Sequence, residues 1–158
     1  MGLVTTGGMP QMVFEYILKK HGIDHKTDLS MDQSISGYVV ASLGTDSGYV
    51  PYTAYCAKQS YIEKNPQIIQ KFTNAIQEGL DYVNSHTAEE IARTIKPQFP
   101  ETDLDKLTMI VERYQKQDTW KKDTIFQKDS FDLLQNILEE AGELEERVPY
   151  EDLVTTEY

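Results

Sequence analysis

The stretch from Asn65 to Val83 constrains this chain most, because it specifies one long amphipathic helix. Asn65 can cap free backbone amides, and Pro66 occupies the first helical position without the loss of a hydrogen bond. Apolar residues then recur at steps of three and four: Ile69, Phe72, Ile76, Leu80 and Val83. This spacing places them on one face of an α-helix, which we expect to be buried.

Short strands are predicted before this helix. Residues 52–57 (YTAYCA) interleave tyrosines with Thr53 and Cys56, as a half-buried strand does. Residues 37–43 (GYVVASL) are apolar and β-branched, which is typical of a buried strand. Residues 3–6 and 29–35 are weaker strand candidates. Together these segments predict a small sheet with exposed edges.

The rest of the chain is predicted to be helical. Thr87 and Glu90 have the spacing of a capping box and open a helix that buries Ile91 and Ile95. Further helices are predicted from Thr102 and Ser130, and residues 148–154 are expected to dock as an extension. We therefore predict one domain over 1–158, with a small α/β sheet portion over 1–57 and a helical C-terminal portion over 58–158.

A glycine turn lies between the first candidate strand and a predicted helix that ends near Lys19, Lys20 and Gly22. Its residues are Gly7, Gly8, Met9 and Pro10. A turn of this kind presents backbone amides at the positive end of a helix dipole, which suits an anionic group. Pro10 removes one of these amides, and an ordinary strand-to-helix turn explains the glycines equally well.

The formal charge of −11 excludes several classes of partner. A nucleic-acid-binding protein needs a basic face, and so does a protein that binds anionic membrane surfaces. Neither class fits this composition. The sequence also contains no apolar run of membrane-helix length, and its first residues have neither the basic nor the apolar region of a signal peptide, so we expect neither element.

No arrangement of residues predicts catalysis or a metal site. His21 and His25 are four residues apart, but Gly22 interrupts a helix there, so we favour a solvated loop over a metal site. Cys56 is the only cysteine, and we expect it to be a buried structural residue. We therefore predict no enzymatic activity, no cofactor and no metal.

Three segments resemble a known family. They are GGMPQMVFEYILKKHGID (7–24), the stretch from GYVVASLGTDSGYV to HTAEEIA (37–92), and DTWKKDTIFQKDSF to the end (118–158). All three are similar to ABC-transporter substrate-binding proteins of the sulfonate, taurine, nitrate and thiamine-precursor branch. The resemblance implies an α/β fold, here a partial periplasmic-binding-protein-like lobe of type II with a small sheet and a helix-rich C-terminal half.

The resemblance also implies a function. Members of that family close two lobes on a small anionic or heteroaromatic solute and deliver it to a membrane permease driven by an ATPase. The ligand loop of the second lobe corresponds to Thr5, Thr6, Gly7, Gly8 and Met9. Trp120 falls in a structural segment. The parent protein is expected outside the cytoplasm, in the periplasm or as a lipoprotein, although this chain has neither a signal peptide nor a lipid-anchor cysteine.

The chain departs from the family pattern at two places. No first lobe precedes the glycine turn, and a helix, a strand and another helix are missing between Ser36 and Gly37. We therefore expect a binding protein that is truncated at its N-terminus and shortened internally, and that self-associates through exposed sheet edges. The alternative is a non-transport interaction module or non-functional fragment that kept the scaffold without the pocket. A thiamine-pyrimidine synthase is disfavoured, because it needs a cysteine-rich motif.

Overall fold

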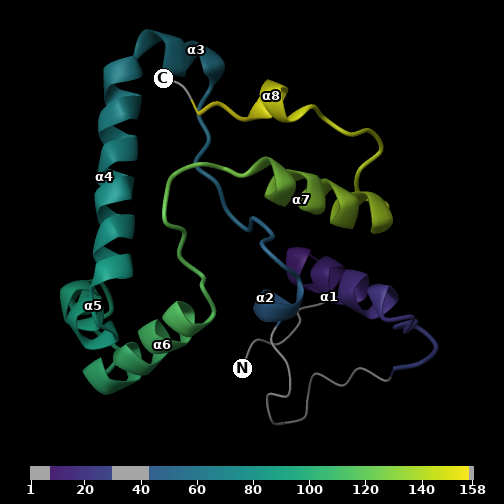
Figure 1. Ribbon diagram of the computed structural model, residues 1–158, viewed down its shortest axis with the longest axis horizontal. Coiled ribbons are helices and arrows are strands. Elements are labelled where there is room, and N and C mark those ends of the chain that lie inside the picture. Colours follow the sequence, from purple (N-terminus) through teal and green to yellow (C-terminus); the bar gives the residue numbers. More distant parts are fainter. Residues whose placement is uncertain (1–7, 30–42, 157–158) are drawn as a thin grey trace. The chain divides into compact units, whose positions relative to one another are not determined.

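Helices dominate the computed structural model, which describes residues 8–29 and 43–156 (Figure 1). The elements are α1 (Met9–Lys20), α2 (Leu43–Asp46), α3 (Gln59–Lys64), α4 (Pro66–Ser85), α5 (Ala88–Ile95), the 3₁₀ helix η1 (Lys96–Gln98), α6 (Leu104–Lys116), α7 (Lys128–Glu140) and α8 (Tyr150–Leu153). None of the described residues lies in a strand. The predicted α/β class, a periplasmic-binding-protein-like lobe with a small sheet, is therefore wrong.

The segment predicted as a strand at 52–57 is irregular. Tyr52 is 75% exposed and Tyr55 is 76% exposed, so the tyrosine spacing does not mark a buried face. A strand needs a neighbouring strand to pair its N–H and C=O groups, and side-chain alternation alone does not supply one. The other strand candidates lie outside the described residues, except that Leu29 is in a loop and Leu43 begins α2.

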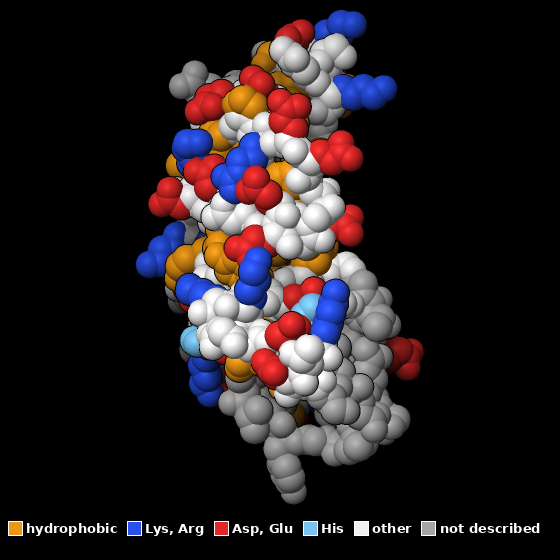
Figure 2. Space-filling model, turned by 90° about the vertical axis from the view of Figure 1, so that its right-hand side faces the viewer, with side chains coloured by type: hydrophobic (Ala, Val, Ile, Leu, Met, Phe, Trp, Pro, Cys, Tyr) orange, Lys and Arg blue, Asp and Glu red, His pale blue; other side chains and the backbone are white. Residues whose placement is uncertain are grey.

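The chain divides into two compact units. Unit 1 is Met1–Tyr55 with Phe126–Thr155, and unit 2 is Cys56–Ile125 with Thr156–Tyr158. Unit 1 has 5 basic and 14 acidic residues, and unit 2 has 10 and 12, so their formal charges are −9 and −2. On the face shown in Figure 2, acidic side chains are scattered over the described residues with basic ones among them. The single domain over 1–158, with a sheet portion over 1–57 and a helical portion over 58–158, stays a prediction.

The core of unit 2 lies between α5 and α6. Its buried residues are Ala88, Ile91, Ala92, Leu107 and Val111, and the partly buried residues around them are Tyr82, Val83, Ile95, Leu104 and Trp120. The buried positions recur at helical spacing on both helices, so two apolar stripes face each other. Trp120 also meets the Tyr114 ring edge-on at 5.7 Å, so its ring packs within unit 2.

The predicted capping box at the start of α5 is confirmed. The Glu90 N–H donates to Thr87 Oγ1 at 3.3 Å, and the Thr87 N–H donates to Glu90 Oε2 at 2.9 Å. The Thr87 hydroxyl donates to the same carboxylate oxygen at 2.8 Å. The N–H and hydroxyl of Thr87 hold the pKa of the Glu90 carboxyl below its ordinary value, because both bonds favour the charged form.

Helix α4 begins at Pro66, as expected, but its surroundings differ from the prediction. Asn65 makes no side-chain cap, and its amide donates to the Tyr61 carbonyl at 2.9 Å instead. None of the residues of α4 is buried: the predicted buried face is half-buried, and Phe72 is 44% exposed. The C-terminal half is fastened within unit 2, where Gln77 and Asn84 each donate to a backbone carbonyl of the 121–122 segment at 2.9 Å.

Unit 1 is built on α1 and α7. Val13 of α1 and Phe131 and Ile137 of α7 are buried, and Lys19 Nζ lies 2.7 Å from Glu140 Oε2. The segment after α7 folds back along it. The Val148 N–H donates to the buried Gln135 side chain at 2.8 Å.

The Tyr150 ring packs edge-on against Phe131 at 5.7 Å, and the Tyr150 hydroxyl donates to the Phe126 carbonyl. Of the segment 148–154 that was expected to dock, Val148 and Tyr150 therefore make the contacts, whereas Leu153 is 66% exposed.

Candidate functional site

The start of α1 is where the sequence places the ligand loop. Of the five predicted residues, Gly8 and Met9 are described, and Thr5, Thr6 and Gly7 lie outside the described residues. Gly8 precedes the helix with a φ of 78°, a backbone conformation that favours glycine. This glycine therefore has a geometric reason to be there whether or not a ligand binds.

The backbone amides at this end are few. The N–H groups of Gln11 and Met12 both donate to the Gly8 carbonyl at 3.2 Å, and Pro10 has no N–H. No described residue accepts from the N–H groups of Gly8 and Met9. The first turn holds no acidic residue, and Lys19 and Lys20 lie in the last turn, so the positive end of the dipole is not neutralised within the helix. These two described amides make a weaker anion site than the several that such sites normally use.

A chain of contacts links α1 to the turn that follows it. Gln11 Nε2 donates to Glu15 Oε1 at 2.6 Å, and His25 Nε2 lies 3.3 Å from the same oxygen. Inside the turn, the Lys26 N–H donates to the Asp24 carboxylate at 2.8 Å. His25 thus contacts Glu15 and braces the loop. The described residues contain no group of three or more His, Cys, Asp or Glu side chains that could hold a metal ion.

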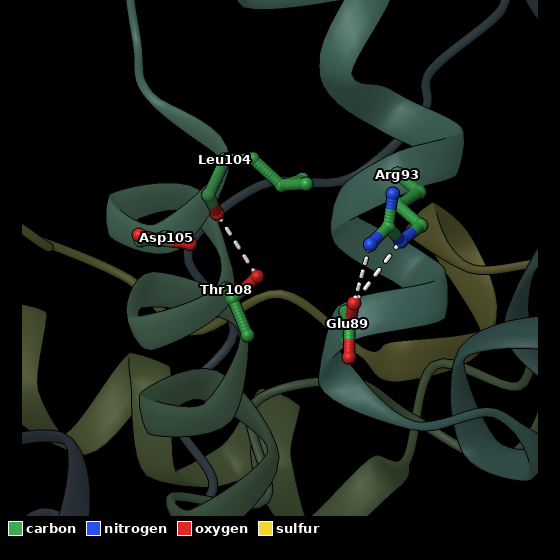
Figure 3. Close-up of a pocket in the computed structure, with 5 residues that line it drawn as sticks. All are labelled: Glu89, Arg93, Leu104, Asp105 and Thr108. Carbon is green, nitrogen blue, oxygen red and sulfur yellow. Dashed lines mark hydrogen bonds and ion pairs between the residues drawn. The ribbon is translucent and has the colours of Figure 1, made fainter.

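An open depression lies between α5 and α6 (Figure 3). It has a volume of about 340 Å³ and is lined by Glu89, Arg93, Leu104, Asp105 and Thr108. Arg93 turns toward Glu89 of its own helix at 2.6 Å, and Thr108 Oγ1 donates to the Leu104 carbonyl at 2.9 Å. Two carboxylates and one guanidinium leave a lining charge of −1, which does not suit an anion.

Sequence reasoning did not single out this depression as a site. The Glu89–Arg93 pair is visible in the sequence as an i,i+4 spacing, but that spacing is common on solvated helix surfaces. Nothing in the sequence pairs these residues with Asp105 and Thr108 on the next helix.

A serine and a histidine come close at the end of α4, but their hydrogen bonds do not form a nucleophile–base pair. Ser85 Oγ lies 3.0 Å from His86 Nδ1 and donates to the Asp81 carbonyl at 2.6 Å. His86 Nδ1 is 2.8 Å from the Tyr82 carbonyl, which can only accept, so this nitrogen acts as a donor and cannot take the serine proton. Ser85 and His86 therefore bond to backbone carbonyls in the last turn of α4.

Cys56 is exposed, so the expectation of a buried structural cysteine is wrong. It lies in the irregular segment before α3, where the predicted strand would have buried it. Within the described ranges, no helix is both long enough and apolar enough to cross a membrane.

A bacterial protein is similar to this chain in sequence. It is 37% identical to a protein of Bacillus subtilis (strain 168) named "Putative binding protein YtlA", over 182 residues that include 96% of this chain and 54% of the relative. The chain therefore spans about half the length of that relative. No protein-family model and no solved structure matches.

The length of the match differs from the length of the chain. The matched region counts 182 residues and the chain has 158, so at least 24 positions inside the match have no counterpart here. The name of the relative supports a binding protein in the general sense. That name specifies neither a transporter nor a ligand.

Proposed function

We propose that this chain is the solute-binding component of an ABC importer, or part of one, and that it acts outside the cytoplasm without catalysing a reaction. The similarity to the Bacillus subtilis binding protein, over 96% of the chain, carries the proposal. The partners in this proposal are a small solute and a permease with its ATPase. The sulfonate, taurine, nitrate and thiamine-precursor branch is the narrower form of the same proposal.

Charge favours one of the two solute classes. Unit 1 contains the start of α1 and has a formal charge of −9, which repels an approaching anion. Among the described residues of the turn, the N–H groups of Gly8 and Met9 are the donors left open, and they offer little to offset that repulsion. A heteroaromatic solute of the thiamine-precursor type is therefore better supported than a sulfonate or nitrate.

Ligand-induced stabilisation tests the proposal. The thermal unfolding of the full chain would be followed with taurine, an alkanesulfonate, nitrate and an aminopyrimidine precursor of thiamine, each added separately. A solute at a hundred times its dissociation constant should stabilise the protein by about 2.7 kcal/mol. If none of these solutes shifts the unfolding temperature, the proposal is wrong, and the interaction module that kept the scaffold becomes the better account.

A pair of glycine substitutions locates the site. Gly8→Ala strains the backbone at the start of α1, where φ is 78°, and the comparison variant Gly142→Ala also places a side chain at a positive φ, 75°, after α7. Ligand stabilisation should fall in Gly8→Ala and persist in Gly142→Ala. Equal ligand stabilisation in the two variants would move the site away from α1.

A further inference from the structure

Helix α4 carries a second apolar stripe, which shares Phe72 with the stripe of Ile69, Ile76, Leu80 and Val83 and lies beside it. Ile68, Phe72, Ala75 and Gly79 recur at steps of four, three and four, which is the spacing of a coiled-coil seam. All four residues are exposed, Ile68 to 53%. A Cβ atom added at Gly79 would meet no atom within 4 Å. We call these four residues the α4 seam.

The α4 seam is complementary in shape to itself in one orientation only. Its large residues, Ile68 and Phe72, lie toward the N-terminus of the helix, and its small residues, Ala75 and Gly79, lie toward the C-terminus. When two copies of α4 pack antiparallel, Ile68 of one faces Gly79 of the other, and Phe72 faces Ala75. Large side chains opposite small ones fill the space between helices well. A parallel arrangement instead places Phe72 against Phe72 and leaves a gap between the two glycines.

The charges beside the seam favour the same orientation. Lys71 and Glu78 each come one position before a seam residue, so both lie along the same edge of it. In the antiparallel arrangement, Lys71 of each copy lies near Glu78 of the other, and two opposite-charge contacts form. Helix α4 belongs to unit 2, whose formal charge is −2, whereas that of unit 1 is −9. Two copies that meet through α4 therefore repel each other less than two copies that meet through unit 1.

We propose that two copies of this chain associate through antiparallel packing of their α4 seams. The proposal does not depend on the proposed solute-binding function. It replaces the expected association through sheet edges, since the described residues contain no sheet. A two-fold axis between the helices makes the interface isologous, so that the same patch serves both copies.

Sedimentation equilibrium of the full chain tests the proposal, over roughly 1 µM to 1 mM so that weak dimers are populated. The wild-type chain should dimerise in a concentration-dependent way. Gly79→Glu places a charge opposite Ile68 of the second copy and should weaken the dimer about tenfold or more. Gln70→Glu adds the same charge on the opposite side of α4 and should leave dimerisation unchanged. A wild-type chain that stays monomeric, or a Gly79→Glu chain that dimerises as well as the wild type, would overturn the proposal.

Loss of folding cannot explain the expected result for Gly79→Glu. Glutamate is a better helix former than glycine, so far-ultraviolet circular dichroism should show helix content that is equal or greater. A charge exchange tests the orientation separately. Lys71→Glu should weaken the dimer about threefold or more, and the double variant Lys71→Glu with Glu78→Lys should return it to near the wild-type affinity. A double variant that is weaker than Lys71→Glu alone would exclude the antiparallel arrangement.

Discussion

Replacing Ile91 by alanine tests the core of unit 2. Ile91 is 1% exposed and belongs to the cluster between α5 and α6. The substitution removes three carbon atoms, worth about 2.4 kcal/mol at about 0.8 kcal/mol for each buried methylene. The cavity left behind raises the expected loss in the free energy of unfolding to about 3–4 kcal/mol. A unit of this size has a total stability of roughly 4–11 kcal/mol, so much of it should be lost.

Trp120 provides the assay. It is the only tryptophan in the chain and packs against the Ile91 cluster, so its fluorescence during urea unfolding reports on unit 2. Met109→Ala is the matched control, because Met109 is on α6 but is 63% exposed. We expect the control to change stability by less than about 0.5 kcal/mol. If Ile91→Ala changes the midpoint no more than Met109→Ala does, the assignment of this core is refuted.

A companion substitution tests whether the two units unfold independently. Ile137 is 1% exposed and lies in the core of unit 1. Ile137→Ala should lose a similar free energy within unit 1 and leave the Trp120 transition in place. If the Trp120 midpoint falls as far as it does in Ile91→Ala, the two units unfold as one.

Three smaller perturbations test local contacts. Thr87→Ala removes the cap of α5 and should cost about 1 kcal/mol in urea unfolding. The lowered pKa of Glu90 means that its contribution is fully present above the unfolded-state pKa, about 4.3, and is lost as the pH falls through the folded-state pKa. The stability difference between wild type and Glu90→Gln should therefore shrink in acid, and a difference independent of pH would contradict this. Gln135→Leu leaves the half-buried Val148 N–H without its acceptor and should cost about 0.5–1.5 kcal/mol, with faster hydrogen exchange over 144–154; unchanged exchange there would show that this bond does not hold the segment.

Local signals in the sequence predicted the helices well. The capping box at Thr87 and the apolar spacing after Asn65 are local signals, because each lies within or next to the helix that it predicts. Burial was harder to predict, because it depends on which other element packs against a given helix face. The stripe at Ile69 and Ile76 has the right period for a core face, yet it is only half-buried in the structure.

The sheet and the depression show two limits of reading a single sequence. Residues 52–57 contain the tyrosines and threonine that strands favour, but Tyr52 and Tyr55 are three positions apart, and a strand exists only when another strand pairs with it. The depression needs Glu89 and Asp105 on facing helices, and their meeting depends on the turn through η1. For the predicted ligand loop, the glycines correctly predicted a turn at Gly8. They did not predict how many backbone N–H groups of that turn lack an acceptor.

The pairing of α1 with α7 determines the order in which parts of this protein can fold during its synthesis. Lys19 and Glu140 are 121 residues apart in sequence and form one ion pair. At about 5–20 residues per second, the ribosome needs about 6–24 s to make that stretch. Unit 2 has its principal segment, Cys56–Ile125, inside this interval, so its helices can pack while Val13 of α1 still lacks its α7 partners. A nascent chain at this stage exposes the apolar side of α1, and a chaperone that recognises short apolar helices would meet it there.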